Sequence, residues 1–342
     1  MWTCAPAPDG VAAFHAALPG YAPTPLTELP PLAAELGVGR VFVKDESHRL
    51  GLPAFKALGA SWAVHRIVEA HRGGAPLTLV TATDGNHGRA VARFARLAGQ
   101  RAHILVPRGV HPDARAAIAA EGARVTRVDG DYDDAVRRAA AARGTPGTVL
   151  VQDVGWPGYE EIPGWVVEGY ATLFAETAAQ LAAAGAGPPG LVAVPTGVGS
   201  LAQAAVVHHR GHPGTRAALL AVEPVGAACV GASLAAGHPV SVPCGATTMT
   251  GLCAGTPSRT AWPHLLAGLD TAVAVADAES ARAARDLAAL GVSAGPCGAA
   301  SLAGARAALT GPHAPTRRAD LDVGPGATVL LLSTEGAEAN PS

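Results

Sequence analysis

One lysine is the strongest candidate for a chemically reactive residue in this 342-residue chain. Lys56 follows the loop segment Leu52-Pro53-Ala54-Phe55 and precedes the apolar stretch Ala57-Leu58-Gly59-Ala60. Because apolar neighbours disfavour an ammonium ion, we expect its pKa to lie below the roughly 10.4 of an unperturbed lysine. A neutral amine can attack an aldehyde and form a Schiff base. Taken alone, the pattern also fits a surface lysine whose stem packs on the protein while its amine reaches solvent.

A second segment of chemical interest follows the strand-like run Leu77 to Ala82. It reads Thr83-Asp84-Gly85-Asn86-His87-Gly88 and leads into a stretch with helical periodicity. Its glycines allow a ligand to approach the backbone closely, and the amide of Asn86 could hydrogen-bond a phenolate oxygen on a cofactor ring. The alternatives are that Asp84 belongs to an ordinary Asp-Gly turn and that His87 only packs within the loop.

The run Thr196-Gly197-Val198-Gly199-Ser200 lies between a strand-like segment, Leu191 to Pro195, and a helical one. Such a helix start presents unpaired N–H groups and a positive dipole end, which suit a phosphate. A nucleotide-binding loop is the competing interpretation, but the Lys-Ser or Lys-Thr of a P-loop is absent. Gly197, Val198, Gly199 and Ser200 therefore favour the phosphate of a small cofactor.

Two hydroxyl residues, Ser333 and Thr334, end the last strand-like run, Thr328 to Ser333. A neutral hydroxyl can hydrogen-bond a pyridine nitrogen without protonating it. Ser333 is the preferred candidate for this contact, although either side chain could instead bind water.

In this order, the segments resemble the fold-type II pyridoxal phosphate enzymes, and among them the diaminopropionate ammonia-lyase family most. Asp84 is the best discriminator, because related serine and threonine dehydratases usually carry a hydroxyl residue there. The most specific stretches are Lys44-Asp45-Glu46-Ser47, Ala54-Phe55-Lys56-Ala57-Leu58-Gly59, Thr83 to Gly88, Gln152-Asp153 with Trp156, Gly158-Tyr159-Glu160-Glu161-Ile162-Pro163, Thr248-Met249 with Gly251-Leu252, and Ser333-Thr334-Glu335-Gly336.

The resemblance implies that Lys56 holds pyridoxal 5'-phosphate and removes the Cα proton of an L substrate. It further implies that Asp84 serves the D isomer and that Asp153 lies near the substrate ammonium. Loss of the β-amino group of 2,3-diaminopropionate would then yield pyruvate and ammonia. The cofactor-binding set would comprise Phe55, Asn86, the glycine turn and Ser333. Asp153 could alternatively cap the segment that follows it.

Other activities on the same scaffold stay open at this point. A serine or threonine dehydratase, or a β-replacement enzyme similar to cysteine synthase, would use a different leaving group. A catalytically silent pyridoxal phosphate-binding homologue belongs to another class, which the presence of both Lys56 and Asp84 disfavours. The chain is also shorter than usual for the family, and Val292 to Gly298 lacks the expected acidic residue.

Strand-like segments alternate with alanine-rich helical ones, which predicts an α/β architecture with parallel-rich sheets flanked by helices. The expected strands are Val41 to Lys44, Leu77 to Ala82, His103 to Pro107, Arg124 to Val128, Thr148 to Gln152, Leu191 to Pro195, Ala217 to Glu223, Thr271 to Val275 and Thr328 to Ser333. The resemblance implies the two-domain fold-type II (tryptophan synthase β-like) arrangement. A smaller domain would span residues 48–160, and a larger one would combine 1–47 with 161–342. Ligand would bind between them, at the carboxyl ends of strands.

Composition narrows the classes of partner. A net charge of −2 argues against nucleic-acid binding, and no apolar run reaches the roughly 18 residues of a membrane span. The N-terminus lacks a secretory pattern, and five cysteines without C-x-x-C spacing indicate reduced thiols, so we expect a cytoplasmic protein without disulfides. His208, His209 and His212 lack further ligands at metal-binding spacing, and no metal site is predicted. The resemblance implies a homodimer that acts on a small amino acid.

Overall fold

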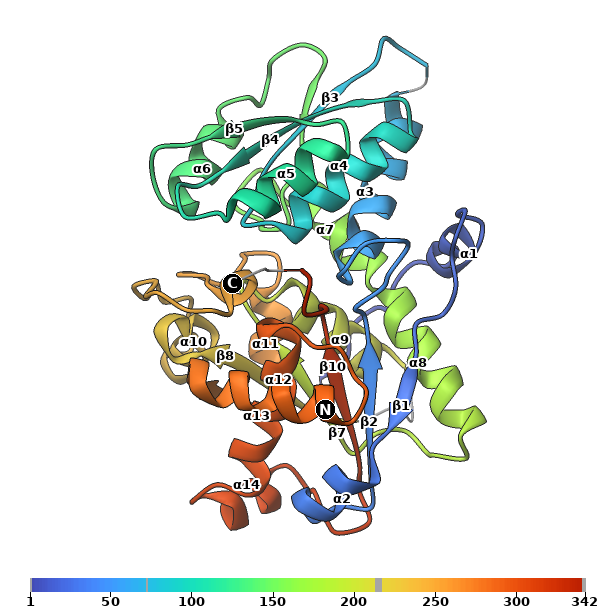
Figure 1. Ribbon diagram of the computed structural model, residues 1–342, viewed down its shortest axis with the longest axis vertical. Helices are drawn as coiled ribbons and strands as arrows, with labels where there is room; N and C mark the ends of the chain where they lie inside the picture. Colours follow the sequence, from blue (N-terminus) through green and yellow to red (C-terminus); the bar gives the residue numbers. More distant parts are fainter. Residues whose placement is uncertain (1, 72, 213–216, 340–342) are drawn as a thin grey trace.

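The computed structural model describes residues 2–71, 73–212 and 217–339, and it contains two sheets, each with helices packed against it (Figure 1). The larger sheet has the strand order β1-β2-β10-β7-β8-β9. Neighbouring strands are parallel except for β1 and β2, which are antiparallel. The strands are β1 (Leu26–Glu28), β2 (Arg40–Asp45), β7 (Leu191–Pro195), β8 (Ala218–Pro224), β9 (Thr271–Val275) and β10 (Thr328–Ser333).

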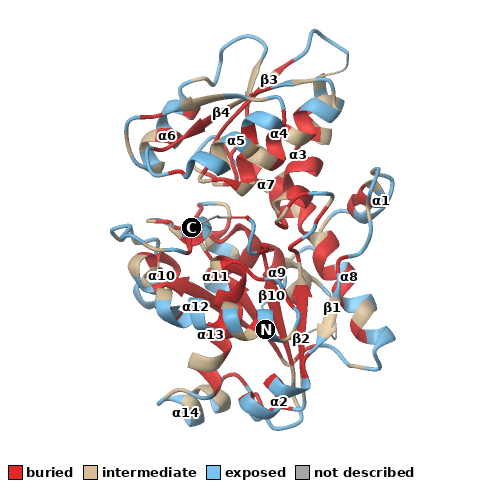
Figure 2. Ribbon diagram, viewed as in Figure 1, coloured by how far each residue is buried: buried red, intermediate tan, exposed pale blue. Residues whose placement is uncertain are grey.

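Both faces of the larger sheet are buried, as alternation along its central strands requires. In β10, Leu330 and Leu332 pack in one core with α9 (Ser200–Gly211), whereas Val329 and Leu331 pack in another with α13 (Pro296–Leu309). Figure 2 shows buried residues along the strands and along the helix faces that meet them. The sheet therefore provides a rigid platform whose strand ends can position loops.

The smaller sheet is entirely parallel, in the order β5-β4-β3-β6. Its strands are β3 (Thr78–Ala82), β4 (Arg101–Val106), β5 (Arg124–Arg127) and β6 (Thr148–Leu150). One face packs against α3 (Lys56–His71) and α4 (Asn86–Leu97), and the other against α6 (Tyr132–Ala140). The remaining helices are α1 (Val11–Ala16), α2 (Pro30–Leu36), α5 (Pro112–Ala120), α7 (Glu161–Gly169), α8 (Ala171–Ala183), α10 (Cys229–Ala236), α11 (Trp262–Gly268), α12 (Asp277–Ala289) and α14 (Ala314–Asp320), with 3-10 turns η1 (Val225–Ala227) and η2 (Thr250–Leu252).

The predicted α/β class is confirmed, and every expected strand is present with small shifts at its ends. The sequence pattern missed β1, a three-residue edge strand without a buried residue, whose pairing with β2 gives it no hydrophobic signal of its own. The smaller sheet lies within residues 48–160 and the larger one outside them, while the domain boundaries themselves stay a prediction. Met1 and residues 340–342, which the predicted larger domain includes, lie outside the described residues.

None of the helices in the described ranges combines the length and apolar character needed to cross a membrane.

Candidate functional site

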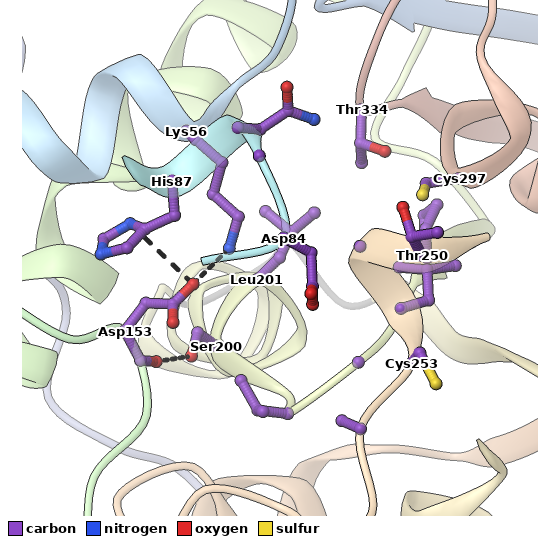
Figure 3. Close-up of a pocket in the computed structure, with 18 of the residues that line it drawn as sticks. Lys56, Asp84, His87, Asp153, Ser200, Leu201, Thr250, Cys253, Cys297 and Thr334 are labelled. Atoms are coloured by element: carbon purple, nitrogen blue, oxygen red, sulfur yellow. Dashed lines mark hydrogen bonds and ion pairs between the residues drawn. The ribbon is translucent and has the colours of Figure 1, made fainter. Parts of the chain in front are cut away.

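A cavity lies where loops from both sheets meet (Figure 3). Loops that follow β3, β6, β7 and β10 contribute to it, so it stands at the carboxyl ends of parallel strands, where open α/β sheets usually bind ligands. Among the residues that line it are nine site residues predicted from sequence: Phe55, Lys56, Asp84, Asn86, Asp153, Gly197, Val198, Gly199 and Ser200. The remaining predicted residue, Ser333, does not line the cavity, whereas its neighbour Thr334 does.

Lys56 is the first residue of α3, and the loop before it is tied to the end of β10. Phe55 N donates to Thr334 O at 3.1 Å, and Glu46 N donates to Ser333 O at 2.9 Å. These backbone bonds fix the start of α3 beside the end of β10. Lys56 is thereby held at the junction between the two sheets.

A buried group of charged side chains anchors the same loop. Lys44 and Arg49 are fully buried and share the carboxylate of Glu176 from α8, at 2.7 and 2.6 Å. Arg49 also bonds Glu46 at 2.6 Å. Buried ions tolerate this environment only when paired, so the four side chains depend on one another. The motif Lys44-Asp45-Glu46-Ser47 therefore has a structural role in holding the segment that leads to Lys56.

The amine of Lys56 donates to Asp153 Oδ2 at 2.6 Å, and its side chain is 18% exposed. Burial alone would lower the pKa of Lys56, as the apolar neighbours suggested. The Asp153 carboxylate, with a smaller contribution from Tyr170, outweighs burial and raises this pKa above its ordinary value. The expected lowering of this pKa is therefore wrong, because no local pattern indicates that a carboxylate 97 positions away pairs with this amine.

Asp153 follows β6 and is held by its neighbours rather than acting as a helix cap. Ser200 Oγ donates to Asp153 O at 2.7 Å, which ties the loop to the start of α9. Tyr159 Oη donates to Leu150 O and accepts from Gln152 N, at 2.9 and 2.7 Å, and so clamps the end of β6. Although burial opposes it, the Lys56 ammonium keeps the pKa of Asp153 below its ordinary range. Asp153 is thus an anion beside the lysine.

The pKa of Asp84 is shifted upward, in the opposite direction to that of Asp153. It stands in the turn between β3 and α4, where Thr83 Oγ1 accepts bonds from Gly85 N and Gly88 N, each at 3.0 Å. Burial, followed by repulsion from Asp153 and Asp133, raises the pKa of Asp84 to about 7. A carboxyl group with this pKa can take up or release a proton near neutral pH, which a general base requires.

His87 lies behind Asp153 (Figure 3). Its Nε2 atom is 2.8 Å from Val151 O, and because a carbonyl only accepts, Nε2 must carry the proton of a neutral ring. Nδ1 is 4.0 Å from Asp153 Oδ2 and has no hydrogen-bond partner among the described residues. Burial lowers the pKa of His87, so the ring is a neutral neighbour of Asp153.

The cavity fits the phosphate of the cofactor that the resemblance implies. Gly199 has φ +97°, a left-handed conformation that favours glycine, and no side chain caps the start of α9. A Cβ atom at Gly197 would approach Gly251 O at 3.2 Å, so glycine leaves this turn open. The first N–H groups of α9 are consequently available to an anion.

The hydroxyl of Ser333, next to the cavity-lining residue Thr334, suits the nitrogen of a heteroaromatic ring. Ser333 Oγ is fully buried and has no hydrogen-bond partner within the described part of the chain. A Cβ atom at Gly298 would lie 2.9 Å from this oxygen, so a side chain there would crowd the hydroxyl. An unpartnered buried hydroxyl is costly unless a ligand satisfies it, and a pyridine nitrogen would do so.

Glu335, which follows the end of β10, connects the starts of α4 and α13 in the cavity wall. It accepts Cys297 N at 3.1 Å and Asn86 Nδ2 at 2.7 Å. Asn86 thus already spends one amide hydrogen on Glu335, and its second hydrogen remains for a ligand. Because Glu335 lies far from Asn86 and Cys297 in the chain, a local sequence pattern does not reveal these contacts.

Sequence reasoning missed several cavity residues, among them Tyr132, Thr250, Cys253 and Cys297, and also Tyr170, which packs behind Phe55. Thr250 and Cys253 flank the Gly251-Leu252 pair that had been noted, so this segment carried a signal. Tyr132 and Tyr170 carried none, since a tyrosine at a helix start is an ordinary packing residue.

No group of three or more His, Cys, Asp or Glu side chains in the described ranges is placed to hold a metal ion. The rings of His208 and His209 instead lie against Phe174, and His208 also contacts His212.

Comparison with known proteins agrees with this geometry. A family model described as pyridoxal-phosphate dependent enzyme matches residues 17–334. The diaminopropionate ammonia-lyase of Salmonella typhimurium strain LT2 is 35% identical, over 95% of this chain and 88% of that protein. The diaminopropionate ammonia-lyase of Escherichia coli K12 is 34% identical, over 94% of this chain and 86% of that protein. A crystal structure of the Escherichia coli enzyme with an aminoacrylate–PLP azomethine reaction intermediate has a TM-score of 0.89 at 34% identity, covering 98% of this chain and 91% of that one.

Proposed function

We propose a function from the family of this chain, which belongs to the pyridoxal-phosphate dependent enzymes and, within them, to the diaminopropionate ammonia-lyase family. The proposed reaction is elimination of the β-amino group of 2,3-diaminopropionate. The products are pyruvate and ammonia. The observation that carries this proposal is that Asp84 and Asp153, two of the three carboxyl residues that line the cavity, share it with a single lysine, Lys56. Their surroundings give the two carboxyl groups opposite pKa shifts, which suits one to proton transfer and the other to charge pairing.

The residues that would hold pyridoxal phosphate surround the cavity. The start of α9, with Gly197 to Ser200, would bind the phosphate, and Ser333 Oγ would meet the ring nitrogen. Asn86 would donate to the ring oxygen, and Phe55 would pack beside Lys56. When bound, the cofactor supplies an aldehyde that combines with an amine and a ring that delocalises the electron pair left by a Cα proton.

Lys56 and Asp84 divide the proton transfers. We infer that Lys56 Nζ takes the Cα proton of the L isomer and that a carboxylate oxygen of Asp84 takes the Cα proton of the D isomer. Asp153 accepts from Lys56 Nζ and keeps the amine directed into the cavity. Asp84 carries a proton below about pH 7 and acts as a base above it.

The charge of the site favours a diamine over a hydroxy amino acid. Asp133 is a second carboxylate, besides Asp153, that acts on Asp84, and Asp84 also lines a neighbouring pocket. Asp153 is already paired with Lys56, whereas Asp84 has no cation among the groups that shift its pKa. A substrate with a second ammonium group supplies the missing positive charge, and serine does not.

Substrate comparison tests the proposal. Purified protein loaded with pyridoxal phosphate should release pyruvate and ammonia from D- and L-2,3-diaminopropionate with a kcat/KM at least about tenfold above that for L-serine or L-threonine, the ratio given by about 1.4 kcal/mol. A preference for either hydroxy amino acid would favour a dehydratase. Loaded protein that is inert toward all four compounds would favour a silent binding homologue.

We further propose that the protein is a cytoplasmic homodimer. All five cysteines are free, which suits a reducing compartment. Light scattering coupled to size-exclusion chromatography measures the assembly directly, and a mass equal to one chain would contradict the dimer.

A further inference from the structure

Tyr170 stands at the junction of α7 and α8 and is fully buried. Its hydroxyl has no hydrogen-bond partner within the described residues. Leaving a buried phenol unpaired is costly, and a tyrosine that served packing alone could be phenylalanine. The hydroxyl therefore needs an explanation other than packing.

Two glycines bring Tyr170 against the start of α3. A Cβ atom at Gly59 would lie 2.6 Å from Tyr170 Cε1, and a Cβ atom at Gly169 would lie 2.7 Å from Gly59 Cα. The crossing of α3 and α7 thus depends on small residues at its closest point. Gly59 is one turn after Lys56, so the tyrosine ring is packed on the turn that begins with the lysine.

Phe55 links the same two side chains from another side. The Tyr170 ring lies 4.8 Å from the Phe55 ring, between centroids, and Lys56 Nζ lies 5.2 Å from the centroid of Phe55. Lys56 and Tyr170 also act on each other electrostatically. Tyr170 raises the pKa of Lys56. Burial raises the pKa of Tyr170 to about 12, and Lys56 opposes this rise. The Lys56 amine is therefore the polar neighbour of the Tyr170 hydroxyl, although the two atoms do not meet ordinary hydrogen-bond geometry.

We propose that Tyr170 is a positioning residue for Lys56, whose hydroxyl holds the amine when it is neutral as well as when it is charged. This rests on the proposed function, in which Lys56 must exist as a free base. A carboxylate such as Asp153 only accepts hydrogen bonds, so it can hold an ammonium firmly and offers nothing to an amine lone pair. A phenol can both accept from the ammonium and donate to the lone pair, and so can orient Lys56 before and after it takes a proton.

The substitution Tyr170→Phe tests this, because it removes the hydroxyl and keeps the ring beside Gly59. The first readout is the pKa of the Lys56 amine in protein freed of cofactor, obtained from the pH dependence of trace acetylation at Lys56 by mass spectrometry. The other groups that face Lys56 are Asp153, His87 and Cys297, and the substitution leaves them in place. We expect the pKa of Lys56 to fall in Tyr170→Phe and to stay unchanged in Tyr21→Phe, whose hydroxyl bonds Glu176 outside the cavity.

The second readout is turnover of L-2,3-diaminopropionate by loaded protein. We expect kcat to fall about tenfold in Tyr170→Phe, the loss that corresponds to one hydrogen bond, with KM changed less than about twofold. An unchanged or raised pKa of Lys56 would overturn the positioning role even if the wild type is an active lyase. Failure of the wild type to turn over diaminopropionate would instead overturn the proposed function, and the acetylation readout would still report on Tyr170.

Discussion

The Lys56 amine and the Asp153 carboxylate form a partly buried ion pair of 2.6 Å that reverses the effect of burial on the lysine. Each member is stabilised in its charged form by the other, so the protein without cofactor stores a protonated lysine. Covalent attachment of an aldehyde requires that proton to leave. We therefore expect the pair to influence the pH at which an aldehyde can react with Lys56.

Substitution of Asp153 tests this consequence. In Asp153→Asn, burial of Lys56 remains while the carboxylate that raised its pKa is lost, so the pKa of Lys56 should fall. The rate at which cofactor-free protein takes up pyridoxal phosphate covalently should reach half its maximum at a lower pH than in the wild type. Stopped-flow absorbance across a pH series measures this midpoint, and an identical midpoint in both proteins would argue against the pair as the controlling feature.

Asp84 should impose a pH dependence on one enantiomer. Because its pKa is raised to about 7, Asp84 is protonated below that pH and becomes a base above it. Turnover of D-2,3-diaminopropionate should therefore rise as the pH increases through about 7, and Asp84→Asn should lower it by about 100-fold or more. Turnover of the L isomer should lose much less. Equal losses for both enantiomers would refute the division of labour between Asp84 and Lys56.

The buried charges around Glu176 should dominate stability. Glu176→Gln leaves Lys44 and Arg49 buried with less compensating charge, so we expect a loss of about 3 kcal/mol in the free energy of unfolding. Glu28→Gln is the matched control, since Glu28 pairs with Arg40 at the surface and should contribute less than about 1 kcal/mol. Denaturant titration of both variants gives the comparison, and similar losses would show that burial does not govern these pairs.

The turn that carries Asp84 should tolerate no side chain at Gly88. A Cβ atom there would lie 2.2 Å from Thr83 Cγ2 and 2.8 Å from Ile104 Cγ2. Gly88→Ala should consequently cost about 1–3 kcal/mol and displace Asp84, which lowers activity toward the D isomer. Gly109→Ala, where no atom lies within 4 Å of the added carbon, should behave as the wild type in thermal unfolding.

Much of the fold follows from local pattern. Buried strands such as β7 and β10 were predicted with their observed limits, because runs of apolar residues bounded by glycine, proline or hydroxyl residues carry a strong local signal. The edge strand β1 was not predicted, because its residues pair with a strand on one side only and are partly exposed. Its existence depends on a neighbour rather than on its own sequence.

The site was predictable where residues belong to contiguous motifs and unpredictable where it depends on partners distant in the chain. Lys56, Asp84 and the glycine turn at Gly197 all lie in contiguous motifs that are recognisable in the sequence. The sequence did not reveal that Glu335 would accept a hydrogen bond from Cys297 N, or that Tyr170 would reach the start of α3. Both contacts are made by tertiary packing between elements far apart in the chain.

Borohydride reduction of the loaded protein tests the central claim most directly, because reduction fixes any Schiff base between Lys56 and pyridoxal phosphate as a stable bond. Peptide mass spectrometry should then find the phosphopyridoxyl group on Lys56 in the wild type and no labelled peptide in Lys56→Ala. Label on a different lysine, or wild-type protein that stays colourless and unlabelled after incubation with pyridoxal phosphate, would contradict the account.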